Sequence, residues 1–318
     1  MKQLLNILLL MFLAACANIE ATEIPVVTAT KAIPTNIPTN TSLPTTPLPP
    51  ITPTTKIPCD PFRVDFCITD GHLILQRPIH PPANDLVDET YGYASTANGT
   101  REPHHGVEFP NKSGTPVYAA ADGTIIFAGP DQIAVYSSWV NFYGNLVVIK
   151  HNDDLFTLYA HLSKIDVEEG QAVSAGDKIG EVGRTGVAIG SHLHFEVRHG
   201  NGEDYFATQN PELWLIPAKD ANGDPFGTLM ISIVDQNHHL INYAKFTIGY
   251  YSDRSQPPIK TYYEITYSAD MLKGDENAAL GELSAGNYRI VVETNGQIYE
   301  RWVEVESGKL TEVAFIVK

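Results

Sequence analysis

The chain has 318 residues, of which 43% are hydrophobic, so it can bury the cores of one or two folded domains. Its formal net charge of −16 disfavours nucleic acid or another polyanion as a partner. The composition therefore excludes a chain that is disordered throughout and indicates a folded, acidic protein.

The first residues predict an export signal. A short basic start, Met1-Lys2-Gln3, precedes an apolar run that ends in Leu13-Ala14-Ala15-Cys16 and is too short to span a bilayer. This ending resembles the lipobox of bacterial lipoprotein signals; the alternative is an incidental cysteine. The resemblance implies that residues 1–15 are a signal peptide and that Cys16 is lipidated, which anchors the protein to a membrane without spanning it.

The residues after Cys16 have the composition of a linker. Residues 17–57 contain 11 Thr and 8 Pro, and such a segment cannot bury enough apolar surface to offset the entropy of ordering it. We therefore assign residues 16–57 to the lipidated cysteine and a disordered spacer. At ~3.1 Å per residue, the spacer could carry the next domain up to roughly 100 Å from a membrane.

Two cysteines follow the linker. Cys59 and Cys67 lie eight residues apart, and in an exported protein this spacing favours a disulfide that closes a short loop. The alternatives are two unpaired thiols or a metal role, for which no neighbouring His or Cys offers support.

Residues 58–217 are predicted to form an all-β domain with an N-terminal extension. From about Asp70 onward, short β patterns alternate with Gly, Asn and Asp, and no long amphipathic helix interrupts them. We expect antiparallel sheets in a sandwich or partly closed barrel. The expected strands are Thr115–Ala120, Gly123–Ala128, Asn145–His151, Leu155–Leu162 and Ser191–Arg198.

Residues 218–318 are predicted to form a second β domain, a sandwich without histidine clusters. The turn and strand from Leu283 to Val292 resemble small transthyretin-like or carboxypeptidase-regulatory sandwiches. The expected strands are Leu229–Val234, Ala244–Tyr251, Thr261–Tyr267, Tyr288–Glu293, Ile298–Glu306 and Thr311–Val317.

One predicted strand carries a metal-binding pattern. Side chains alternate along a strand, so His192, His194 and Glu196 point one way, while the apolar residues between them point into a packed layer. Upstream, His104 and Glu108 are four apart, which places both on one side of an extended segment. Together these segments offer three metal ligands and a spare imidazole, as in a zinc hydrolase.

The central segment resembles the lysostaphin-like, LytM-type zinc metallopeptidases, which cut peptide bonds in bacterial peptidoglycan. The resemblance covers roughly 140 residues and rests on motifs in the family's order. These motifs are Tyr91-Gly92-Tyr93, His104 to Glu108, Gly114 to Gly123, Tyr143 to Ile149, Leu158 to Leu162, Val173 to Gly180, Gly183 to Gly186 and Ser191 to Val197.

The resemblance implies a fold, a metal and site residues. The fold is an antiparallel β-sheet domain of the duplicated-hybrid-motif type, with the metal in a groove. Position by position, His104, Glu108 and His194 would bind zinc, and His161 and His192 would be the catalytic pair. Alternation along the strand also places His161 on the face of Tyr159, opposite Leu158.

Two features of the upstream motif need an interpretation. The family has aspartate where this chain has Glu108, and glutamate remains an accepted zinc ligand, so we expect the metal to be retained. His105 leaves the register open by one residue, but only His104 keeps the three-residue gap to the acid.

The function that follows is a zinc-dependent endopeptidase acting on peptidoglycan stem or cross-bridge peptides. Such a site would activate water for attack on the scissile amide, with His161 and His192 handling protons in an order that the sequence does not reveal. Arg184 is a candidate contact for a substrate carboxylate. The alternative is a catalytically inactive protein that binds peptidoglycan or activates a cell-wall amidase. Either would be exported and lipid-anchored in the bacterial envelope, in an oligomeric state that the sequence does not indicate.

Overall fold

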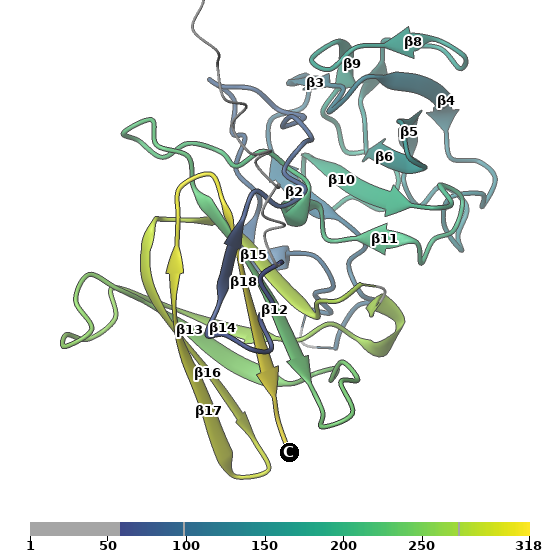
Figure 1. The fold of residues 1–318 in the computed structure, drawn as a ribbon. Coiled ribbons are helices and arrows are strands. Elements are labelled where there is room, and N and C mark those ends of the chain that lie inside the picture. The colour runs from purple at the N-terminus through teal and green to yellow at the C-terminus, as the bar shows by residue number, and fades with distance from the viewer. Residues whose placement is uncertain (1–57, 98, 273) are drawn as a thin grey trace, which may run out of the picture. The chain divides into compact units, whose positions relative to one another are not determined.

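The computed structural model describes residues 58–97, 99–272 and 274–318 (Figure 1). The predicted signal peptide, Cys16 and the Thr/Pro-rich linker lie outside these residues. The described residues belong to one compact unit, Lys56–Lys318, which contains both predicted β domains. Their division at residue 217 stays a prediction.

Strands dominate the described residues, which confirms the all-β prediction. Helical turns are limited here to three-residue 3₁₀ segments at Glu89–Tyr91, Pro211–Leu213 and Ala269–Met271. Within the described ranges, none of these turns has the length or apolar character needed to cross a bilayer.

The largest sheet has seven strands, and its centre is β10 (His192–His199). One edge of β10 pairs with β6, and its other edge pairs first with β2 and then with β11, always antiparallel. The remaining strands follow in the order β6 (Leu155–Ala160), β5 (Asn145–Lys150), β4 (Gly123–Pro130) and β8 (Ala172–Val173), while β2 is Val107–Pro110 and β11 is Thr208–Gln209.

Both faces of this sheet are buried. On β5, Val147 and Ile149 pack into one core with Phe195 of β10, while Leu146 and Val148 pack into another beneath Tyr143. A small sheet accompanies the first core and is formed by β3 (Pro116–Tyr118), β9 (Lys178–Glu181) and β7 (Lys164–Ile165). The polar side chains on the second face of β10 are therefore largely buried, and those of His192 and His194 line a groove.

The C-terminal region is a sandwich of two four-stranded sheets around a shared apolar core. Within it, β12 and β18 run parallel, in contrast to the antiparallel pairs around them. One sheet has the order β1 (Cys67–Thr69), β18 (Leu310–Ile316), β12 (Gly227–Val234), β15 (Ala278–Leu283). The other has the order β14 (Lys260–Ile265), β13 (Lys245–Tyr251), β16 (Gly286–Thr294), β17 (Gln297–Val305).

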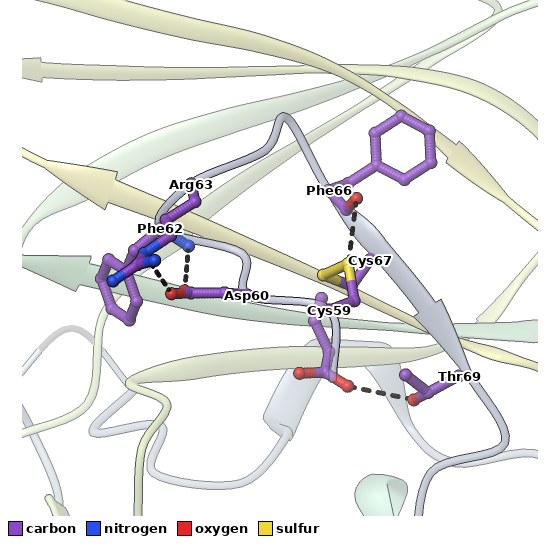
Figure 2. The surroundings of a disulfide bond; sticks show 8 residues. Cys59, Asp60, Phe62, Arg63, Phe66, Cys67 and Thr69 are labelled. Carbon is purple, nitrogen blue, oxygen red and sulfur yellow. Dashed lines mark hydrogen bonds and ion pairs between the residues drawn. A yellow bond between two sulfur atoms is a disulfide. The ribbon is translucent and has the colours of Figure 1, made fainter. Parts of the chain in front are cut away.

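The first part of the N-terminal extension, β1 with the loop before it, joins this C-terminal sandwich, whereas Leu75, Ile79, Val87 and Tyr93 pack into the core beside the large sheet. β1 pairs antiparallel with β18, and Thr69 Oγ1 donates a hydrogen bond of 3.0 Å to Glu312 Oε1. Cys59 and Cys67 form a disulfide with their Cα atoms 5.8 Å apart, at the start of β1 (Figure 2). Sequence analysis grouped these residues with the first domain because a three-residue strand carries no sign of its distant partner.

Candidate active site

The pairing of β2 with β10 brings the first metal-ligand candidates together. Glu108 lies directly opposite His194 in the register, so both side chains project from the same face of the sheet. Gly106 lets the chain pass close to β10, because a Cβ atom there would lie 2.4 Å from the carbonyl oxygen of Phe195. The His104 side chain, two residues before Gly106, extends to the same place, beside Glu108 and His194.

Three potential ligand atoms converge there. His104 Nε2 lies 2.9 Å from Glu108 Oε1 and 3.1 Å from His194 Nδ1, and His194 Nδ1 lies 3.1 Å from Glu108 Oε1. All three residues are buried. Ligands of a tetrahedral zinc ion lie roughly 3.3 Å from one another, since each is ~2.0–2.1 Å from the metal. This donor set therefore fits zinc in both chemistry and spacing.

Hydrogen bonds behind the two imidazoles fix which nitrogens face the site. His104 Nδ1 lies 3.2 Å from the carbonyl oxygen of Gly92, and His194 Nε2 lies 2.9 Å from Glu196 Oε1. Each of these nitrogens donates its proton outward, so the nitrogen facing the site can offer a lone pair. His104 would therefore bind metal through Nε2 and His194 through Nδ1.

The electrostatics of the cluster favour a bound cation. Burial raises the pKa of Glu108, but His194 and hydrogen bonds from His104 and His192 outweigh it and hold this pKa well below its usual value. Burial lowers the pKa of His194, while Glu108 and Glu196 raise it to about 9. Glu108 Oε2 is buried without an aligned hydrogen bond, although His192 Nε2 lies 2.9 Å away. An ionised, buried carboxylate between imidazoles suits a metal ligand.

A buried charged network supports His194 from behind. Glu196 Oε2 accepts hydrogen bonds from Arg198 Nε at 2.8 Å and Nη2 at 2.7 Å, and Tyr143 Oη donates to Glu196 Oε1 at 2.6 Å. Burial raises the pKa of Glu196, but Arg198 and His194 lower it to about 2. This network was not predicted from the sequence. The pattern that indicates it is the alternation of four polar residues, from His192 to Arg198, with apolar residues between them.

The structure brings His161 and His192 beside the cluster. Their ring centroids are 5.0 Å apart, and the His161 ring lies 5.6 Å from that of His194. His161 reaches this position by a route that strand alternation did not predict. Tyr159 packs into the core on the other side of the sheet, so a regular strand would direct His161 away from the site. Instead, β6 ends at Ala160, and His161 has a left-handed φ of 63° that turns its ring toward the site.

The environment of His161 sets its protonation. Nδ1 lies 2.9 Å from the carbonyl oxygen of Thr185, so it carries the proton and leaves Nε2 as an acceptor. Burial, together with the nearby His194 and His192, lowers the pKa of His161 to about 3. His161 is therefore neutral at physiological pH.

His105 lies outside the cluster. Its ring stacks on Tyr205 with centroids 3.7 Å apart, and Nδ1 lies 3.3 Å from Thr208 Oγ1. This geometry favours His104 over His105 as the ligand candidate. The spacing between His104 and Glu108 in the sequence indicates the same choice.

All five site residues line one groove of about 780 Å³. Aromatic and apolar side chains form much of its wall: Trp139, Phe142, Val187, Ile189 and Tyr205. Arg184 is exposed and does not line the groove, whereas Arg101 does.

Two imidazoles and a carboxylate, flanked by two further imidazoles in an open groove, define a metallopeptidase-type site. The match to known families agrees. Residues 102–206 match the model of peptidase family M23.

Individual relatives match the same region. Peptidoglycan DD-endopeptidase ShyA of Vibrio cholerae is 43% identical over 95 residues, which are 30% of this chain and 20% of that protein. Murein hydrolase activator NlpD of Escherichia coli is 36% identical over 118 residues, which are 37% of this chain and 27% of that protein. The chain thus covers well under a third of either relative.

One solved structure is similar over part of this chain. The catalytic domain of lysostaphin from Staphylococcus simulans is 34% identical over 40% of this chain and 88% of that chain, with a TM-score of 0.33.

Proposed function

We propose that the protein is a zinc-dependent endopeptidase that hydrolyses peptide bonds in peptidoglycan stem or cross-bridge peptides and so remodels the cell wall. The observation that carries this proposal is the convergence of His104, Glu108 and His194 within the M23 segment. The similarity to a relative named peptidoglycan DD-endopeptidase supports the substrate class.

His104, Glu108 and His194 would hold the metal, with Glu196 holding His194 in its ligating orientation. Zinc bound there would act as a Lewis acid on the scissile carbonyl and bring the pKa of water toward neutrality. Glu108 in place of aspartate is compatible with this role, because its Oε1 already reaches both imidazoles.

The two remaining imidazoles would handle protons at the groove. His161 is neutral, and its Nε2 can accept a hydrogen bond from the attacking water and orient it. His192 also lines the groove and is partly exposed, so it can approach the substrate. It would stabilise the oxyanion or protonate the leaving amine.

The cellular location is part of the proposal. The leader and the lipobox-like ending at Cys16 support export and attachment to a membrane, and the Thr/Pro-rich spacer supplies reach toward the wall. Mass spectrometry of the N-terminal peptide from membrane fractions tests this, with Cys16→Ala as the control. A diacylglyceryl mass on Cys16 is expected, and an unmodified thiol would contradict the anchor.

The second candidate is an activator of a separate cell-wall hydrolase, since one relative is named murein hydrolase activator. The assembled donor set favours catalysis over this alternative.

The experiment that separates the two functions is incubation of the purified protein, alone, with purified peptidoglycan. The proposal expects release of new amino groups without new reducing ends, loss of this release with a chelator, and recovery with zinc. Release of amino groups only after a second hydrolase is added would support the hypothesis that the protein is an activator.

A further inference from the structure

We propose that Arg101 forms a subsite that recognises a free carboxylate of the substrate peptide, within about three residues of the cleaved bond. This inference rests on the proposed endopeptidase function and specifies which peptides the groove selects. Arg101 belongs to the groove wall but contacts none of the potential metal ligands directly.

A stack of side chains connects Arg101 to the metal-ligand candidates. The Arg101 guanidinium carbon lies 5.0 Å from the Tyr91 ring centroid, and Tyr91 stacks on His104 with centroids 4.2 Å apart and ring planes 18° apart. These two contacts keep the guanidinium within about 9 Å of the His104 ring. An extended peptide advances ~3.3 Å per residue, so the guanidinium lies at most about three residues of substrate from the His104 ring.

The charge of Arg101 is available to a ligand. It is the only lysine or arginine among the described residues that line the groove. Its side chain is exposed, and no carboxylate of the described chain lies within ion-pair distance. A guanidinium that stacks on an aromatic ring keeps N–H donors at its edge, where a carboxylate can accept two hydrogen bonds.

Two acidic residues, Asp88 and Glu102, line the groove with Arg101, and neither neutralises its charge. Asp88 Oδ1 accepts hydrogen bonds from Thr90 N at 2.9 Å and Thr90 Oγ1 at 2.7 Å, which commits it to a turn. Glu102 is exposed and makes no ion pair with Arg101. Elsewhere the groove wall is largely aromatic and aliphatic, so an anionic substrate group has its favourable position at Arg101.

The test measures binding of one peptide in two charge states. Stem-peptide fragments of peptidoglycan are used as free acids and after conversion of their carboxylates to carboxamides. Binding is measured on the zinc-loaded full chain in a His161→Asn background, which prevents turnover. The variants are Arg101→Ala, Arg101→Lys and, as a matched control, Arg184→Ala, an exposed arginine outside the groove.

The parent protein should bind the free acid about fivefold more tightly than the carboxamide, the effect of one exposed charge pair. Arg101→Ala should abolish this preference, Arg101→Lys should keep part of it, and Arg184→Ala should leave it intact, with equal zinc content throughout. Equal binding of both forms by the parent, or a preference that survives Arg101→Ala, would overturn the subsite alone. Binding of neither form would overturn the proposed substrate class as well.

Discussion

His194 Nε2 and Glu196 Oε1 lie 2.9 Å apart on β10, and this contact joins the candidate metal centre to a fully buried ion pair with Arg198. The carboxylate holds the imidazole in the orientation that directs Nδ1 at Glu108. A second carboxylate behind a ligating histidine raises the basicity of that ligand and fixes its tautomer.

Replacing Glu196 with glutamine should weaken both metal binding and the fold. We expect zinc affinity to fall about 10- to 100-fold, measured by competition with a chromophoric chelator. The free energy of unfolding should fall by about 3–5 kcal/mol, because buried Arg198 loses its counter-charge. Arg198→Met is the control, since it disturbs the ion pair but not the contact to His194. A folded Glu196→Gln protein with unchanged zinc affinity would contradict the positioning role.

His161 should be needed for hydrolysis but not for zinc binding. His161→Asn keeps a residue type that tolerates the left-handed backbone at this position. We expect one zinc retained per chain and a fall in hydrolysis of about 10²- to 10⁴-fold. The matched control is His199→Asn, an exposed histidine at the far end of β10. Full activity in His161→Asn would remove His161 from the mechanism.

The Cys59–Cys67 disulfide should stabilise the chain without affecting the metal centre. It closes a loop of eight residues beside β1, in the C-terminal sandwich (Figure 2). Replacing both cysteines with serine should lower the free energy of unfolding by about 2–3 kcal/mol in urea, while zinc content stays unchanged. Loss of zinc on removal of the disulfide would show that β1 also supports the large sheet.

The stability of the protein should fall as pH rises, partly because of Glu212. Burial and the nearby Glu282 raise the pKa of Glu212 from its ordinary 4.5 to about 8, while its Oε2 accepts a hydrogen bond from Gly281 N. A raised folded-state pKa gives stability that is complete below pH 4.5 and lost as pH rises through 8.

Glu212→Gln should therefore flatten the decline in melting temperature between about pH 5 and 8.5. Glu293→Gln, at an exposed position on β16, serves as the control and should follow the wild type. A decline in Glu212→Gln as steep as in the wild type would show that other groups govern it.

Sequence periodicity predicted the long strands well, because alternation over six or more residues is specific. The expected strand Asn145–His151 is observed as Asn145–Lys150, and Ala244–Tyr251 as Lys245–Tyr251. The two-residue strands β7, β8 and β11 were missed, since two residues carry no pattern. The four-residue strands β2 and β9 and the six-residue β15 (Ala278–Leu283) were also missed. Pairing of β1 with β18 joins residues more than 240 apart, which no local signal reveals.

The site was predictable where residues share one strand face. Alternation placed His192 and His194 on one face, and in the structure both side chains reach Glu108. For His161 the same rule pointed to the wrong core, because the chain leaves the strand at that residue with a positive φ. The family resemblance identified His161 as a site residue, whereas strand alternation alone would have placed its side chain on the wrong face of the sheet. The roles of Arg198 and Tyr143 behind His194 were not predicted, because the burial of a polar side chain is not visible in a sequence.

The most direct test of the account is zinc content and amine release in wild type and Glu108→Ala, with Glu102→Ala as a control acid in the same groove. The wild type should contain about one zinc per chain and show chelator-sensitive hydrolysis. Zinc should be retained in Glu102→Ala, and both zinc and hydrolysis should be lost in Glu108→Ala. A Glu108→Ala protein that keeps zinc and hydrolyses peptidoglycan, or a wild type that binds no zinc, would contradict it.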